Sequence, residues 1–378
     1  MNGGSSPKAS QSYAPGLEFD VRPTPRPVPA AERAAQLVDP GFGRVFTDHM
    51  VTIRYNEGKG WYDARVEAFG PIPLSPATAA LHYAQEIFEG LKAYHTADGG
   101  VTMFRPEENA RRMQSTASRM AMPRLPEEIF LQAVQALVAQ DREWIPTQPG
   151  GSLYLRPFMF ATEVFLGVKP SSDYLFCVIA SPVGSYFAGG VQPVSVWVSE
   201  EYTRAGRGGT GAAKCAGNYA ASLVAQAEAI EAGCDQVVFL DARDGRYVEE
   251  LGGMNMFAVY GEGDDITLVT PPLGGTILPG ITRDSVLTLA GRFGYRVEER
   301  PYSLEEWRAD AGSGRLRESF ACGTAAVVTP IGRVRGNGVD FSVAGGQEGP
   351  VTRRLREVLL DIQHGRGEDP FGWVHRLF

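Results

Sequence analysis

The segment GRGGTGAAKCAGNY, residues 206–219, contains the residue types whose spacing points most directly to chemistry. It carries a formal Gly-x-Gly-x-x-Gly pattern, and three residues later a lysine, Lys214. A glycine-rich loop of this form can hold a nucleotide phosphate. A lysine among small residues is poorly solvated, which favours its neutral, nucleophilic form. A solvent-exposed loop lysine is the third interpretation of the segment.

The glycines do not have the context that nucleotide-binding motifs need. A dinucleotide fingerprint starts directly after a strand, and its last glycine opens a helix. Here seven residues separate the strand ending near Val198 from Gly206, and the next helix is expected to begin at Asn218. The ATP P-loop requires Gly-Lys-Ser/Thr, whereas the lysine stands between Ala213 and Cys215. A nucleotide-dependent dehydrogenase is therefore a remote alternative, and the lysine is the better candidate for the reagent.

Other segments supply groups that a pyridoxal phosphate (PLP) site requires. Tyr219 is suited to hydrogen-bond the phenolic oxygen of the ring. Glu250, in VEELGGMNMF, is suited to keep the pyridine nitrogen protonated, so that the ring accepts electrons. Ile281 and Thr282 are expected at a helix N-terminus, where amide groups and the helix dipole favour a phosphate. Taken singly, Glu250 can equally be an exposed turn residue and Thr282 a helix cap.

Seven segments together resemble the branched-chain amino-acid aminotransferases of PLP fold type IV, within the class IV aminotransferases. The likeness is strongest to the longer subgroup that includes the animal enzymes, and it runs from about residue 40 to the C-terminus. One such motif is weak, but seven in the same order are specific. In chain order they are YAQEIFEGLKAY, FRPEENARRM, SLYLRP, GGTGAAKCAGNYAASL, EELGGMNMF, ILPGITRDS and CGTAA.

This resemblance implies a role for each matching residue. Lys214 would be the Schiff-base lysine of pyridoxal 5'-phosphate and the proton shuttle between the substrate Cα and the cofactor. Glu250 would pair with the pyridine nitrogen and Tyr219 with the phenolic oxygen. The other cofactor-binding residues that it implies, most of them at the phosphate, are Arg105, Arg204, Leu278, Ile281, Thr282 and Thr324.

The resemblance also implies a substrate pocket. A branched aliphatic side chain needs apolar, aromatic walls. Ala325, with Thr324, would offer backbone amides to the substrate α-carboxylate, and Arg156 would receive the distal carboxylate of glutamate. The aromatic residues that match the walls in the family are Phe88, Tyr154 and Tyr186, together with Tyr83, which would reach across a homodimer interface.

The implied reaction is a ping-pong transamination between L-leucine, L-isoleucine or L-valine and 2-oxoglutarate. D-amino-acid aminotransferases and aminodeoxychorismate lyases share the fold and remain alternatives, although SLYLRP and EGLKAY favour the branched-chain enzyme. Two departures stand out. Ala326 follows Ala325 where some animal members carry a C-x-x-C pair, so no such redox switch is expected. Gly253 stands where many members have threonine, which puts one phosphate contact in doubt.

Composition narrows the possible partners and the compartment. The 36 basic and 44 acidic residues give a net charge of −8, which argues against nucleic-acid and anionic-membrane partners. The 4 cysteines and 5 histidines are scattered, so neither a metal site nor a disulfide framework is expected. No run approaches the ~18 apolar residues of a membrane span. A reducing, cytoplasmic location fits best.

Strands and helices are mixed along the chain without regular alternation, which favours a mixed α/β (α+β) fold over one doubly wound sheet. We expect a flexible N-terminal arm over residues 1–40, a smaller α/β domain over 41–183 and a linker over 184–194. A larger PLP-binding domain over 195–378 would have a barrel-like β core, as the resemblance implies. Helices are predicted over residues 75–89, 106–121, 126–141, 218–232 and 350–364.

Overall fold

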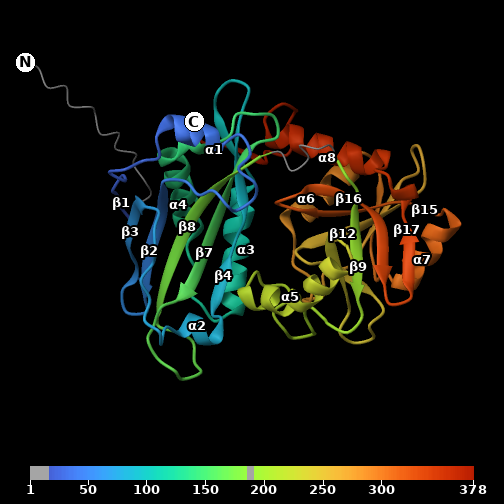
Figure 1. Ribbon diagram of the computed structural model, residues 1–378, viewed down its shortest axis with the longest axis horizontal. Coiled ribbons are helices and arrows are strands. Elements are labelled where there is room, and N and C mark those ends of the chain that lie inside the picture. Colours follow the sequence, from blue (N-terminus) through green and yellow to red (C-terminus); the bar gives the residue numbers. More distant parts are fainter. Residues whose placement is uncertain (1–16, 185–190) are drawn as a thin grey trace, which may run out of the picture.

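The computed structural model describes residues 17–184 and 191–378 of the chain. Two nine-stranded sheets form two lobes that lie side by side (Figure 1). In the described residues, no helix is both long and apolar enough to cross a lipid bilayer.

The first sheet has the strand order β1-β3-β2-β8-β7-β5-β6-β18, and β4 pairs with β7. Helices α3 (Pro106–Arg119) and α4 (Glu127–Gln140) pack on it, and the apolar side of α4 is buried with the central strands in one core. The strands are β1 (Phe19–Val21), β2 (His49–Asn56), β3 (Gly60–Ala68), β4 (Glu86–Phe88), β5 (Leu91–His95), β6 (Val101–Phe104), β7 (Ser152–Ala161), β8 (Asp173–Val183) and β18 (Val374–Arg376).

The second sheet has the order β11-β10-β9-β16-β15-β12-β13-β14, with β17 on β16. Strand β11 also pairs with β12, so six strands close into the barrel-like core that the family resemblance implied. The strands are β9 (Val194–Ser199), β10 (Gln236–Leu240), β11 (Val248–Leu251), β12 (Met254–Tyr260), β13 (Thr267–Thr270), β14 (Arg296–Glu299), β15 (Leu316–Gly323), β16 (Val327–Gly336) and β17 (Val339–Ser342). The helices of this lobe are α5 (Ala216–Glu231), α6 (Ile281–Arg292), α7 (Leu304–Ser313) and α8 (Pro350–Gln363).

The helix predicted over residues 75–89 is wrong at both ends. Helix α2 covers only Ala79–Tyr83, and Ala84 takes a left-handed conformation with φ of 49°. The chain then enters β4, which pairs with β7, and the Phe88 N–H donates to the Lys214 carbonyl at 3.0 Å. Sheet pairing therefore overrides local helix propensity here, and it brings Phe88 beside the lysine.

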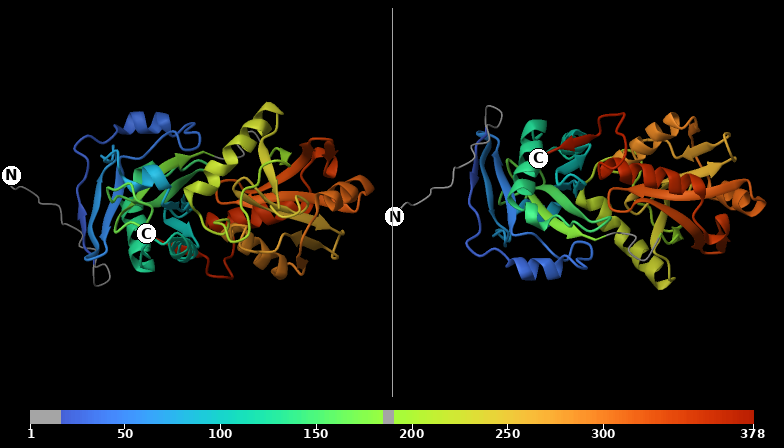
Figure 2. Two further views of the ribbon diagram at one scale, coloured as in Figure 1. Left: turned by 90° about the horizontal axis from the view of Figure 1, so that it is seen from below. Right: turned by 90° about the horizontal axis from the view of Figure 1, so that it is seen from above.

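Both ends of the chain take part in the first lobe in ways that the sequence did not predict. Of the arm expected over residues 1–40, the described part contains β1, which pairs with β3, and helix α1 (Ala30–Gln36). Figure 2 shows α1 on one side of the first sheet and α4 on the other. At the opposite end of the sequence, β18 pairs with β6. The range 41–183 predicted for the smaller domain thus leaves out β1 and β18, and β18 falls within the range 195–378 predicted for the larger domain.

Candidate active site

A cavity of about 220 Å³ contains the Lys214 side chain and is lined from both lobes. The lysine lies just before α5, a helix that Figure 1 shows between the two lobes. Its amine therefore meets groups from both lobes. The lining residues from the first lobe are Phe42, Phe88, Gly90, Arg112, Tyr154 and Arg156. Those from Lys214 onward are Lys214, Tyr219, Glu250, Gly253, Asn255, Leu278, Gly280, Ile281, Thr282, Cys322, Gly323, Thr324 and Ala325.

Lys214 is held at its backbone and at its amine. Its N–H donates to the Thr116 hydroxyl at 3.1 Å, and its Nζ donates to the Tyr219 hydroxyl at 2.8 Å. The amine also lies over the Phe88 ring, 4.7 Å from the centroid. The interpretation as a solvent-exposed loop lysine is therefore wrong, because the amine is fixed inside a cavity beside a phenol.

The glycine-rich loop before the lysine does not form a phosphate cradle. Arg119 donates to the carbonyls of Gly208 and Gly209, both at 2.9 Å, so the loop offers oxygen atoms to a cation. A phosphate cradle needs N–H groups instead. At Gly211 a Cβ atom would lie 2.2 Å from the Thr276 carbonyl oxygen, so glycine permits a close backbone approach. The dehydrogenase alternative loses its structural basis.

Glu250 lies on β11 with 1% exposure and faces the cavity. Burial raises the pKa of Glu250 to about 7, while the charge of Arg204 and a hydrogen bond from the Leu278 N–H lower it. Arg204 forms an ion pair with Glu250 and donates to the Thr276 carbonyl at 3.1 Å. The predicted place of Arg204 near a phosphate is thus corrected: it does not line the cavity, because the buried carboxylate needs its counter-charge.

Arg105, predicted at the phosphate, also lies outside the cavity. Its guanidinium donates to Asp284 at 2.6 Å and to Ser285 at 2.8 Å, and it stacks on Trp373. Arg112, one of two arginines that follow in FRPEENARRM, lines the cavity instead. Sequence analysis missed it, although it stands in a segment already singled out. Arg105 stands at the start of helix α3 and Arg112 in its second turn, and only the tertiary structure distinguishes them.

The N-terminus of α6 and the β15–β16 turn close the cavity on the barrel side. Gly280 precedes the helix, and a Cβ atom there would lie 2.0 Å from the Asn255 side-chain oxygen. Ile281 and Thr282 are the first two residues of α6 and line the cavity. Their predicted location at a helix N-terminus is confirmed. Lys92 from β5, a residue that sequence analysis did not single out, donates to the Ala325 carbonyl at 2.8 Å and supports the turn.

The aromatic residues predicted as walls meet at the other end of the cavity. Arg156 donates to the Tyr154 hydroxyl at 3.1 Å, and its guanidinium lies over the Phe88 ring at 4.8 Å. Phe42, just after the predicted N-terminal arm, adds a ring 5.1 Å from that of Tyr154. Sequence analysis did not single out Phe42, because a lone aromatic residue between two glycines is a weak signal.

Two predicted residues are not part of this cavity. Tyr83 lies on α2, and its hydroxyl donates to the Leu166 carbonyl. It does not line the cavity within one chain, so its contribution across a dimer interface stays a prediction. Tyr186 lies outside the described residues.

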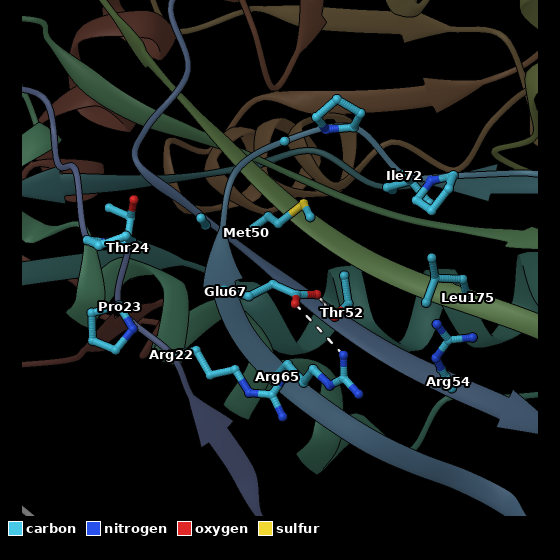
Figure 3. Close-up of a pocket in the computed structure, with 15 residues that line it drawn as sticks. Arg22, Pro23, Thr24, Met50, Thr52, Arg54, Arg65, Glu67, Ile72 and Leu175 are labelled. Atoms are coloured by element: carbon cyan, nitrogen blue, oxygen red, sulfur yellow. Dashed lines mark hydrogen bonds and ion pairs between the residues drawn. The ribbon is translucent and has the colours of Figure 1, made fainter.

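A larger hollow of about 560 Å³ lies on the first lobe over β1, β2 and β3 (Figure 3). It presents three arginines, but Arg65 pairs with Asp63 at 2.8 Å and Arg22 with Asp20 at 2.7 Å. Its lining residues include no lysine, histidine or cysteine. Size alone therefore does not identify the reactive site, whereas the converging amine, carboxylate and phenol do.

Comparisons with known proteins identify the family of the chain. A sequence model of the amino-transferase class IV family matches residues 86–334. A probable branched-chain-amino-acid aminotransferase of Streptomyces coelicolor is 56% identical over 360 residues, which cover 95% of this chain and 98% of that protein.

Two solved structures are similar as well. The Escherichia coli branched-chain amino acid aminotransferase has a TM-score of 0.70 at 28% identity, covering 86% of this chain and 99% of that one. The T.th. branched-chain amino acid aminotransferase, complexed with N-(5'-phosphopyridoxyl)-L-glutamate, has a TM-score of 0.67 at 29% identity, covering 86% and 98%. The chain belongs to the class IV aminotransferases and, within them, to the branched-chain amino-acid aminotransferases.

Proposed function

We propose that this aminotransferase uses pyridoxal 5'-phosphate, held by Lys214, to exchange amino groups between L-leucine, L-isoleucine or L-valine and 2-oxoglutarate. The observation that carries the proposal is the Lys214 amine, 2.8 Å from the Tyr219 hydroxyl in a cavity that also holds Glu250 and Arg112. The similar T.th. enzyme, whose complex contains a phosphopyridoxyl group joined to L-glutamate, supports the cofactor and one substrate.

The residues present fit this cofactor by their chemistry. The cavity offers an amine, a buried carboxylate, a phenol, an arginine and a helix N-terminus. The amine matches an aldehyde, the carboxylate a pyridine nitrogen and the phenol a phenolic oxygen, while the arginine and the helix N-terminus match a phosphate. Around the phosphate we therefore assign Arg112 in place of Arg105, together with the amides of Ile281 and Thr282 and the Thr324 hydroxyl.

When bound, the cofactor supplies an aromatic ring that accepts electrons. Lys214 holds it and, once displaced by the incoming amino acid, carries a proton to and from the substrate Cα. Tyr219 donates to the phenolic oxygen and orients the amine. Glu250, whose charge Arg204 balances from behind, holds a proton on the pyridine nitrogen. Leu278 contributes the N–H that contacts the Glu250 carboxylate at 3.5 Å.

At the other end, Phe42, Phe88 and Tyr154 form an apolar wall for a branched aliphatic side chain. Arg156 lies at this wall with its charge spread over two aromatic faces, 4.8 and 5.4 Å from the ring centroids. It can thus pair with the distal carboxylate of glutamate without placing a bare charge against leucine. The amides of Thr324 and Ala325 would bind the α-carboxylate in both half-reactions.

Exposed apolar residues support a homodimer. Leu81 on α2 and Val164, Leu166 and Val168 on the β7–β8 loop are between 59% and 88% exposed, and a bridge between Thr78 and Val164 joins the two segments. Such a cluster is typical of a protein interface. Tyr83 stands beside it, which supports its predicted role in the partner's pocket. A cytoplasmic location stays a prediction.

Trapping and assays test the proposal. After incubation with pyridoxal 5'-phosphate and borohydride reduction, peptide mass spectrometry is expected to find the pyridoxyl group on the peptide containing Lys214. In steady-state assays L-leucine with 2-oxoglutarate is expected to react, and D-alanine or aminodeoxychorismate is not. A label on another lysine contradicts the cofactor assignment, and turnover of D-alanine in preference to L-leucine contradicts the substrate assignment.

A further inference from the structure

Glu89 is a buried carboxylate that the proposed mechanism does not use. It lies in the turn between β4 and β5 with 0% exposure, and it does not line the cavity. Burying a carboxylate is costly unless it is paired and hydrogen-bonded. Its neighbours in sequence are Phe88 and Gly90, which both line the cavity. The hydrogen bonds of the Glu89 carboxylate therefore show which residue of the site it supports.

Three of the four hydrogen bonds that the described residues donate to the Glu89 carboxylate come from α3, the helix that carries Arg112. Arg112 donates Nε to one carboxylate oxygen and Nη2 to the other, both at 2.8 Å. Asn109, one turn earlier on α3, donates to the same carboxylate at 2.8 Å, and the Gly90 N–H donates at 3.2 Å. Such a bidentate pair fixes the orientation of the guanidinium plane and also balances its charge.

The Nη1 side of the Arg112 guanidinium is turned away from Glu89, toward the segment before α6. Its Nη1 donates to the Pro279 carbonyl at 3.1 Å, just before the N-terminus of α6. Of the five N–H groups of a guanidinium, the hydrogen bonds among the described residues use three. The remaining two N–H groups belong to Nη1 and Nη2. Arg112 lines the cavity together with Ile281 and Thr282 at the N-terminus of α6, where a phosphate would also meet the helix amides.

The pair also keeps the charge of Arg112 despite its burial. Burial alone lowers the pKa of Arg112, and the charge and hydrogen bonds of Glu89 more than offset that effect, so the pKa is raised. A carboxylate behind the guanidinium reduces the net positive charge at the phosphate. Glu89 therefore helps phosphate binding by orientation and not by charge, because it holds the two remaining N–H groups of Arg112 toward the cavity.

We propose that Glu89 is a positioning residue for the cofactor phosphate, acting through Arg112. The proposal rests on the PLP site proposed above and deepens it. A purely structural ion pair would affect all ligands of the cavity alike through the fold. A positioning role distinguishes ligands that carry the phosphate from ligands that lack it.

The test compares pyridoxal 5'-phosphate with pyridoxal, which lacks the phosphate, in binding titrations of apoprotein followed by visible absorbance. In Glu89→Gln we expect the affinity for pyridoxal 5'-phosphate to fall about tenfold or more, since a hydrogen bond to a charged group is lost. The affinity for pyridoxal should change less than twofold. Inorganic phosphate should also raise the melting temperature of the apoprotein less in the variant than in the wild type.

Glu318→Gln is the matched control. Glu318 is also a buried carboxylate, with 3% exposure, and accepts three hydrogen bonds from Val351 and Thr352 at the start of α8. Its substitution is expected to lower stability without changing the ratio of the two affinities. If Glu89→Gln does not fold, Glu89→Asp keeps the charge but shortens the reach, and it should show the same selective loss to a smaller extent.

The outcomes separate this inference from the proposed function. An equal loss for both ligands, or wild-type affinity for pyridoxal 5'-phosphate in a folded Glu89 variant, overturns the positioning role. In both cases the wild-type protein still binds the cofactor, so the proposed function stands. If the wild-type protein develops no visible band with either ligand, the proposed function itself fails.

Discussion

The two ends of the cavity differ in how their charges are held. At the cofactor end each charged group has a buried partner within the chain: Arg204 pairs with Glu250, and Glu89 with Arg112. At the substrate end, Arg156 lies against the rings of Phe88 and Tyr154, and Phe42, which also lines the cavity, is 47% exposed. Within one chain, the charges at the cofactor end are thus paired with one another, whereas the charge at the substrate end lies against aromatic rings.

The largest expected effect comes from Lys214→Ala, which removes the group shared by both ends. We expect the rate to fall by about 10⁴-fold or more, because the proton transfer loses its base. Single-turnover kinetics with L-leucine measures this step. A variant that retained the wild-type rate and the visible band would contradict the assignment.

The next effect separates Arg105, which directly precedes α3, from Arg112 within that helix. Arg112→Ala is expected to weaken binding of pyridoxal 5'-phosphate by about 100-fold, since charge-assisted hydrogen bonds to the phosphate are lost. Arg105→Ala is the matched control, because its guanidinium is equally buried but paired with Asp284 outside the cavity. It should change that affinity less than twofold. Equilibrium titration measures both, and a reversed order of the two losses would restore Arg105 to the site.

A smaller effect is expected at the substrate end. Phe42→Ala removes one aromatic wall and should raise the KM for L-leucine about tenfold, since burying a phenylalanine side chain stabilises by about 1.5–3 kcal/mol. Affinity for the cofactor should stay unchanged. Steady-state kinetics and cofactor titration together check this division, and a parallel loss of cofactor would show that the two ends are not independent.

The smallest effect concerns pH. Burial lowers the pKa of Lys92 to about 8, so its ammonium, which supports the Ala325 turn, is charged below that pH and neutral above it. The KM for a 2-oxo acid, whose carboxylate does not titrate in this range, should therefore rise about two- to threefold from pH 7 to pH 9. In Lys92→Met this rise should be absent, and a persisting rise would assign the titration to another group.

Local sequence patterns predicted much of the architecture. The helices expected over residues 106–121, 126–141 and 350–364 correspond to α3, α4 and α8 within two residues at each end. The prediction around α2 failed because pairing of β4 with β7 competes with local propensity, and such a pairing is not visible in a short window. Strand β18 was missed for the same reason, since its partner β6 lies far away in sequence.

The candidate site shows the same division. Lys214, Tyr219 and Glu250 were identified because each stands in a distinctive motif, and the structure brings them into one cavity. Arg105 and Arg112 could not be separated from the sequence, since both stand in FRPEENARRM, one directly before α3 and the other in its second turn. They are about 10 Å apart along the axis, and only the position of α6 decides which of them meets the cavity.

The sequence by itself determined the reactive groups, because an amine, a carboxylate and a phenol are properties of residue types in recognisable motifs. Tertiary structure alone decided which arginine faces the cavity, that Arg204 balances Glu250, that Glu89 holds Arg112 and that Phe42 completes a wall. These are pairings between residues far apart in sequence. The physical reason is that a buried charge takes the partner that the packing of the two lobes brings within hydrogen-bond distance.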